Sequence, residues 1–106
     1  MKIKTSGATP MQIDWAVAKC EGLRTYVEVV EGFKPSTDWM QGGPIIEREG
    51  ISLYLDTNNL WQANIFDGNP AVFGTGVEGE TPLIAAMRCY VASKLGDEVE
   101  IPDELK

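Results

Sequence analysis

Two segments, one near each end of the chain, carry the signals that begin and end a helix. Residues 9–22 and residues 81–96 both start with Thr-Pro and end with glycine. A threonine hydroxyl can accept a hydrogen bond from a free amide of the first turn, proline fits that turn, and glycine suits the residue after a helix. Because apolar residues recur at helical spacing in both segments, we predict two amphipathic helices that pack on a core.

The stretch between these helices holds three segments with strand character. Residues 25–30 are rich in β-branched and aromatic residues, and residues 51–55 alternate between apolar and polar side chains. Residues 56–59 have the composition of a turn, and residues 60–66 return to strand composition. We therefore predict a first strand over 25–30 and a β-hairpin after it.

The order helix, strand, strand, strand, helix predicts an α+β fold, in which a three-stranded antiparallel sheet carries both helices on one face. In outline this order is similar to that of double-stranded-RNA-binding modules. Residues 33–50 are predicted as an irregular connection with room for two short helical turns. Residues 67–80 contain four glycines and a proline, which favours a mobile surface loop.

The size of the chain, 106 residues, is that of one domain. We place this domain at residues 1–96. Residues 97–106 hold five acidic residues and one lysine, so we predict an acidic C-terminal tail, with Ile101 and Pro102 as points where it could dock.

The chain has a net charge of −7 and no histidine. The missing histidine excludes a Ser-His-Asp triad, a Cys-His dyad and any histidine-ligated metal. Cys20 and Cys89 lie inside the predicted helices and are too few for a structural zinc site. We expect two buried, reduced thiols, with a disulfide as the alternative, and no metal or cofactor.

The negative charge argues against nucleic-acid binding, because phosphate contacts supply most of the affinity of such proteins. The second predicted helix starts at residues 78–82 (EGETP), where double-stranded-RNA-binding modules carry basic residues. A local patch of Lys2, Lys4 and Arg24 is the remaining basis for that function. The amino terminus lacks the apolar core of a signal peptide, and the longest strongly apolar run, residues 83–87, is too short for a bilayer, so we expect a cytoplasmic protein without membrane contact.

Residues 35–50 combine prolines and glycines with hydroxyl groups, an aromatic ring and a charged triplet, and rigid connections of this kind present functional groups well. The candidate binding residues are Ser36, Thr37, Asp38, Trp39, Gly42, Gly43, Glu47, Arg48 and Glu49. The alternative is a packed connector in which Trp39 and Ile46 fill the core and Arg48 forms an ordinary ion pair. Since nothing in the sequence shows that the carboxylates converge, no catalytic residue is assigned.

Several segments together resemble a known family. They are residues 14–19 (DWAVAK), 35–39 (PSTDW), 42–51 (GGPIIEREGI), 81–94 (TPLIAAMRCYVASK) and 96–99 (GDEV). Over nearly its whole length the chain resembles the NinX-like proteins of lambdoid phages and prophages. The resemblance implies a small accessory protein, made in an infected or lysogenic bacterium from a gene cluster that also holds recombination functions. It implies no catalytic or binding residue.

These observations favour a non-enzymatic phage or prophage accessory protein that binds a host or phage protein, since negative surfaces steer toward basic partners. The alternative is a small-molecule-binding protein or an unusual enzyme, in which Asp38, Glu47 and Arg48 orient a polar ligand beside Trp39. Nucleic-acid binding is the third and weakest hypothesis. A three-stranded sheet can leave one face open, so a homo-oligomer through that face is a further expectation.

Overall fold

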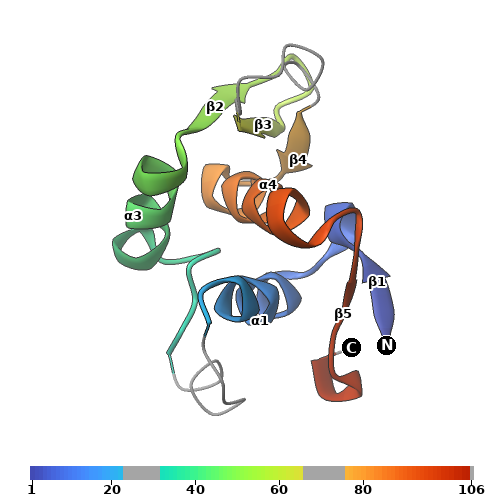
Figure 1. The fold of residues 1–106 in the computed structure, drawn as a ribbon. Coiled ribbons are helices and arrows are strands. Elements are labelled where there is room, and N and C mark those ends of the chain that lie inside the picture. The colour runs from blue at the N-terminus through green and yellow to red at the C-terminus, as the bar shows by residue number, and fades with distance from the viewer. Residues whose placement is uncertain (23–31, 66–75, 106) are drawn as a thin grey trace.

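The computed structural model describes residues 1–22, 32–65 and 76–105 (Figure 1). The described helices are α1 (Pro10–Cys20), α3 (Trp39–Glu49) and α4 (Pro82–Leu95). The strands are β1 (Lys2–Lys4), β2 (Ile51–Leu55), β3 (Trp61–Ile65), β4 (Val77–Gly79) and β5 (Glu98–Glu100), and two short 3₁₀ turns span Thr5–Gly7 and Asp103–Leu105. The predicted α+β class is confirmed.

Both terminal helices begin as their sequences predict. At the start of α1 the Thr9 amide donates to Oε1 of Gln12 (2.9 Å), the reciprocal contact of a capping box. At the start of α4 the Thr81 hydroxyl accepts from the Ile84 amide (3.1 Å). Gly96 ends α4 with φ of 91°, a conformation that favours glycine. These contacts are local in sequence, which is why the pattern of residues reveals them.

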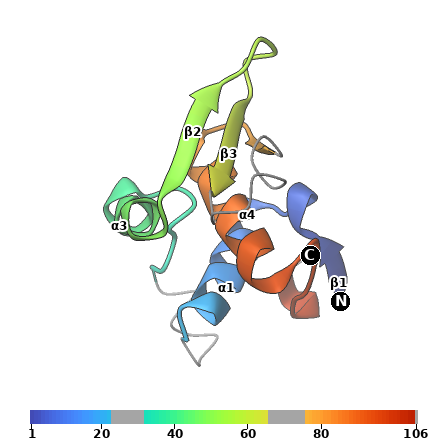
Figure 2. The ribbon, with the colours of Figure 1, turned by 45° about the horizontal axis from the view of Figure 1, so that its top comes forward.

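The predicted hairpin is also confirmed. Strands β2 and β3 pair antiparallel, with Leu53 opposite Ala63. Asp56 orders the turn, because its Oδ1 accepts from the amides of Asn58 (2.8 Å) and Leu60 (3.0 Å). The hairpin extends well beyond the helices (Figure 2).

The third strand of the described sheet is β4, which pairs antiparallel with β3. It lies within the segment that the sequence predicted as a surface loop, and the strand predicted over 25–30 falls outside the described residues. Two contacts at α4 hold β4. The Arg88 Nη1 group donates to the Glu78 carbonyl (2.9 Å), and a side chain at Gly79 would place its Cβ 2.4 Å from the Ala85 amide nitrogen. A three-residue strand fixed by such distant contacts leaves no local signal.

Helix α4 occupies the middle of the molecule. It packs on all three strands of the sheet on one side and on α1 on the other, while α3 lies beside α4 and β2 (Figure 1). The two predicted terminal helices therefore lie on the same side of the sheet. They form successive layers, because α4 contacts the sheet and α1 packs on α4. Residues 83–91 of α4 are all buried, which suits a helix enclosed on opposite faces.

Strands β1 and β5 bring the two ends of the described chain together. Lys2 pairs opposite Glu100 and Lys4 opposite Glu98, with these four side chains exposed. Farther along, the apolar side chains of the acidic segment, Val99, Ile101 and Leu105, are buried in the core cluster. Residues 98–105 thus present their charges to solvent and their apolar side chains to the domain.

Candidate functional site

The candidate binding residues lie on an ordered helix and its approach, where the sequence predicted an irregular connection. The helix α3 has 11 residues. Asp38 begins it, since its Oδ1 accepts from the Met40 amide (3.1 Å), and Gly50 ends it with φ of 66°. Gly42, Gly43 and Pro44 in its interior are poor helix formers, and they are the reason that the sequence pattern hid this helix.

Ser36 anchors the segment before α3 to α1. Its amide donates to Oδ1 of Asp14 (2.8 Å) and its hydroxyl donates to the Pro10 carbonyl (3.3 Å). The Ser36 side chain is 1% exposed. Burial raises the pKa of Asp14, and the hydrogen bonds from Ser36 oppose that shift. Ser36 therefore positions α3 and has little surface to offer a ligand.

Gly42 and Gly43 are adjacent but have different surroundings. A Cβ atom on Gly42 would lie 2.4 Å from the Pro35 carbonyl oxygen and 2.6 Å from Cδ2 of Leu83. Glycine at 42 thus allows α3 to pack closely on α4 and on the segment that Ser36 anchors. A Cβ atom on Gly43 would meet nothing within 4 Å.

Arg48 and Glu49 form a polar network with α1 and α4. The Arg48 Nη1 and Nη2 atoms donate to the two carboxylate oxygens of Glu21 (2.9 and 2.8 Å), and its Nε donates to Glu49 (2.8 Å). The Tyr90 hydroxyl lies 3.2 Å from Nη2 of Arg48 and itself donates to Glu21. Lys94 completes the network, with its Nζ atom 3.6 Å from Oε1 of Glu49.

The charges of this network stabilise one another. The Arg48 guanidinium lowers the pKa of Glu21 and the pKa of Glu49 below their usual range. Burial raises the pKa of the Tyr90 hydroxyl, which therefore stays protonated and donates to Glu21 at neutral pH. The network ties α1, α3 and α4 together. An incoming anion would have to displace two carboxylates from Arg48, so the guanidinium is poorly accessible to a ligand.

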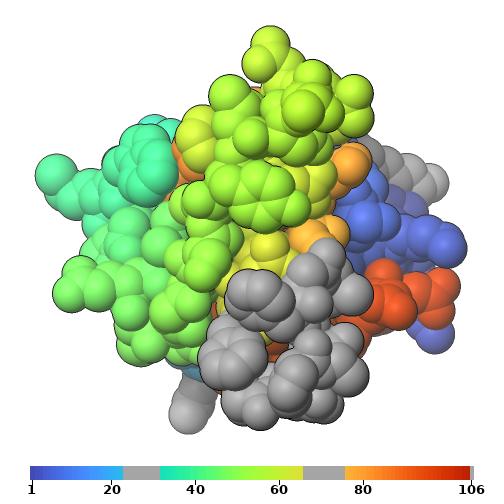
Figure 3. All heavy atoms as spheres, turned by 90° about the horizontal axis from the view of Figure 1, so that it is seen from above, coloured from blue at the N-terminus to red at the C-terminus, as the bar shows by residue number. Residues whose placement is uncertain are grey.

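The opposite side of α3 is open to solvent. We call this surface the outer face of α3. It consists of Trp39, Met40, Gly43, Pro44 and Glu47, and it is bordered by Ile46, which is half-buried and packs against the core. Trp39 is 56% exposed and Met40 is 85% exposed. In the space-filling view of Figure 3, α3 (teal to green) forms one flank of the molecule.

A pocket of about 200 Å³ adjoins the first residue of α3. It is lined by Ser36, Thr37, Trp39, Thr81, Leu83 and Ile84. Three of the candidate residues, Ser36, Thr37 and Trp39, thus meet at one place. Glu47, Arg48 and Glu49 do not line this pocket.

Sequence reasoning did not single out Met40 and Pro44 on the outer face, nor Glu21 and Tyr90 as partners of Arg48. For the exposed residues Trp39 and Met40, the local signal in the sequence was an aromatic residue followed by methionine.

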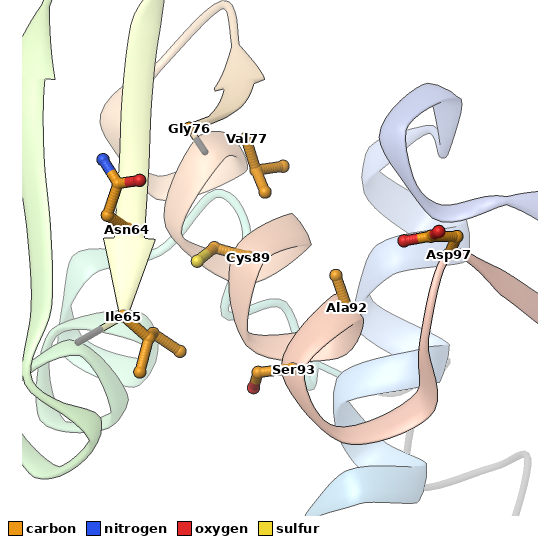
Figure 4. A pocket seen from close by; sticks show the side chains of 8 residues that line it. All are labelled: Asn64, Ile65, Gly76, Val77, Cys89, Ala92, Ser93 and Asp97. Atoms are coloured by element: carbon orange, nitrogen blue, oxygen red, sulfur yellow. The ribbon is translucent and has the colours of Figure 1, made fainter. Parts of the chain in front are cut away.

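A larger pocket, of about 370 Å³, lies between the sheet and α4 (Figure 4). Asn64, Cys89 and Asp97 are among its lining residues, with Asn64 and Asp97 on opposite sides. Burial raises the pKa of the Cys89 thiol to about 11, so the thiol is protonated at neutral pH and is a poor nucleophile. Cys20 and Cys89 are both free, with Cys89 buried and Cys20 half-buried.

Other functional groups are sparse in the described part of the chain. Residues 1–22, 32–65 and 76–105 contain no cluster of three or more histidine, cysteine, aspartate or glutamate residues placed to hold a metal ion. No helix among them has the length and apolar character to cross a bilayer. Lys2 and Lys4 of the proposed basic patch stand opposite acidic residues of β5, and Arg24 falls outside the described residues.

Comparison with known families identifies the family of the chain. A family model described as "Bacteriophage P22, NinX" matches residues 4–94. The matched region includes α1, α3, the sheet of β2, β3 and β4, and all of α4 except its last residue. The match confirms the resemblance that the sequence motifs carry. No curated protein matches the chain.

Proposed function

The chain belongs to the bacteriophage P22 NinX family, and we propose that it acts by binding another protein, of the phage or of the host, in the bacterial cytoplasm. In this role it is a phage accessory protein without an enzymatic activity of its own. The observation that carries the proposal is the exposure of Trp39 and Met40 side by side in the first turn of α3.

Large apolar side chains at such exposure are what protein interfaces bury. Tryptophan is enriched among the residues that dominate binding energy, and methionine adapts to varied partners. The pocket beside Trp39 offers a place for a partner side chain. Both residues stand on an ordered helix that Gly42 and Ser36 hold against the core, so little conformational freedom would be lost on binding.

The geometry gives less support to a small-molecule site on residues 35–50. The pocket at Trp39 has a volume of about 200 Å³, below the roughly 300 Å³ at which typical ligand pockets begin. Arg48, which the alternative hypothesis needs to orient a polar ligand, is bound to Glu21 and Glu49. Asp38 caps α3 with its carboxylate.

Site-specific photocrosslinking tests the proposal. A photoreactive phenylalanine analogue would replace Met40 in the chain, produced in bacteria during phage infection. Tyr54, 51% exposed on the hairpin, is the matched control position. Because a crosslink forms only with a protein in direct contact, we expect a discrete adduct from position 40 and none from position 54.

A second variant adds Trp39→Ala to the chain with the photoreactive residue at 40. This change removes the neighbouring ring, so the yield of the adduct should fall. Equal adducts from positions 40 and 54, or no adduct from position 40, would contradict the proposal. A yield that is unchanged by Trp39→Ala would remove Trp39 from the binding surface.

A further inference from the structure

The middle of α3 contains two residues that weaken a helix without serving the packing of the described chain. Pro44 has no amide hydrogen, so the carbonyl of Met40 lacks its usual helical partner. Pro44 is exposed, and a Cβ atom on Gly43 would have no neighbour within 4 Å. Glycine suits the residue before a proline in a helix, since it has no Cβ to clash with the ring. Gly43 thus accommodates Pro44, and Pro44 itself is exposed to solvent.

The two residues shape the outer face of α3. Positions three and four residues away on a helix are neighbours, so Gly43 lies between Trp39 and Met40 on one side and Ile46 and Glu47 on the other. A glycine surrounded by four larger residues is the kind of depression that receives a side chain from a facing helix. Residues that break a local rule without an internal gain are expected at functional sites.

The charges around this depression indicate the kind of helix that fits. Glu47 forms no salt bridge among the described residues, and Asp38 stands just before the first turn. If a second copy of α3 packed parallel, Glu47 would oppose Glu47. If it packed antiparallel about Gly43, Glu47 would face Trp39, and Asp38 would face Arg48, which is already bound to Glu21 and Glu49. Neither arrangement gives Glu47 a basic partner, whereas a lysine or arginine on another helix would match its charge.

We propose that the outer face of α3 binds an amphipathic helix of another protein, with an apolar side chain of that helix over Gly43 and a basic side chain against Glu47. This inference rests on the proposed function and specifies the chemistry of its partner. The mode is recognition of a helix through its apolar stripe, with the flanking charge setting orientation.

A model peptide tests this chemistry directly. The probe is an amidated amphipathic helix of about 18 leucine and lysine residues, long enough to be helical, labelled with a fluorophore. A leucine and glutamate peptide with the same pattern is the charge control. We expect saturable binding of the leucine-lysine peptide, measured by fluorescence anisotropy, and no comparable binding of the leucine-glutamate peptide.

Surface variants locate the binding. Met40→Glu and Glu47→Lys should each weaken binding about tenfold, a change of about 1.4 kcal/mol. Both residues are exposed, and circular dichroism with thermal unfolding would check that each variant keeps its fold. Tyr54→Ser is the control for loss of an exposed apolar group. Glu104→Lys changes the net charge as Glu47→Lys does, at an exposed site on another element. Both controls should bind as the unmodified chain does.

The proposal would be overturned by absence of leucine-lysine binding, or by binding that falls equally in Glu47→Lys and Glu104→Lys. Self-association of the chain that Met40→Glu abolishes, measured by light scattering, would overturn it in favour of a second copy. An adduct from position 40 without binding of the leucine-lysine peptide would overturn only the basic-helix partner. Absence of that adduct bears on the proposed function, because crosslinking does not depend on the chemistry of the partner.

Discussion

Gly42 and Gly43 show how adjacent residues of one type can serve different purposes. At Gly42 the backbone of α3 comes so close to Pro35 and Leu83 that no side chain fits. At Gly43 the space is open, and the neighbouring Pro44 is exposed to solvent. The first glycine belongs to the packing of the domain, and the second belongs to its surface.

This difference predicts opposite effects on stability. Gly42→Ala should lower the free energy of unfolding by about 1 to 3 kcal/mol, the usual cost of overpacking. The double variant Gly43→Ala with Pro44→Ala should raise it by about 3 kcal/mol, because it restores a hydrogen bond donor and removes two poor helix formers. Urea denaturation of both variants and the unmodified chain measures these changes.

The double variant also separates packing from surface roles. If Pro44 were required by contacts within the domain, replacing it would destabilise the chain. A fall in the midpoint of urea denaturation of the double variant would therefore contradict the assignment of Gly43 and Pro44 to the outer face of α3.

At the scale of elements, Arg48 joins the end of α1 to α3 and α4. Arg48 and Glu21 are 27 residues apart in sequence, and Glu21 is 69 residues from Tyr90. The sequence indicated that Arg48 was either a ligand-binding fork or a member of an ion pair. In the structure the Arg48 guanidinium forms an ion pair with Glu21, and the order of residues did not predict this partner.

The network predicts a dependence of stability on pH. Glu21→Gln should lower the free energy of unfolding at pH 7 by about 1 kcal/mol, near the upper end for a partly exposed ion pair. Since the folded-state pKa of Glu21 is lowered from its ordinary value of 4.5, its contribution is present above that value and is lost as the pH falls through the folded value. The difference between variant and unmodified chain should therefore shrink in acid.

Glu47→Gln is the matched control for this experiment. Glu47 lies one residue before Arg48 on the same helix and is exposed. We expect its replacement to leave the urea midpoint at pH 7 unchanged, because Glu47 forms no ion pair among the described residues. A Glu21→Gln effect that is as large at pH 3 as at pH 7 would show that the lost contribution is not that of the ionised carboxylate.

The whole molecule is organised around α4, with both chain ends joined beside it. The acidic segment predicted as a tail carries Val99, Ile101 and Leu105, which are buried in the core cluster. The division into residues 1–96 and a separate tail remains a prediction, and unfolding experiments can test it.

Leu105→Ala is the change that tests whether this segment unfolds with the domain. If it does, the free energy of unfolding of the whole chain should fall by about 2 to 4 kcal/mol, as for other buried leucines, in a single transition. Glu104→Gln, at the exposed neighbouring position, should have no such effect. Unfolding of the sheet and helices that is insensitive to Leu105→Ala would support an independent tail.

The sequence by itself determined the elements whose signals are local. Thr9, Thr81 and the glycines that follow the helices define α1 and α4, and the alternation around Asp56 defines the hairpin. It also determined the net charge, the absence of histidine and the family, because these depend only on which residues occur and in what order.

Only the tertiary structure decided which residues meet. The helix α3 exists despite Gly42, Gly43 and Pro44, because capping by Asp38 and close packing at Gly42 outweigh weak helix propensity. The layer order, the position of β4 and the pairing of Arg48 with Glu21 all depend on contacts between distant segments. Such contacts form only in the folded chain, where burial and hydrogen bonding act together, and for that reason local patterns do not reveal them.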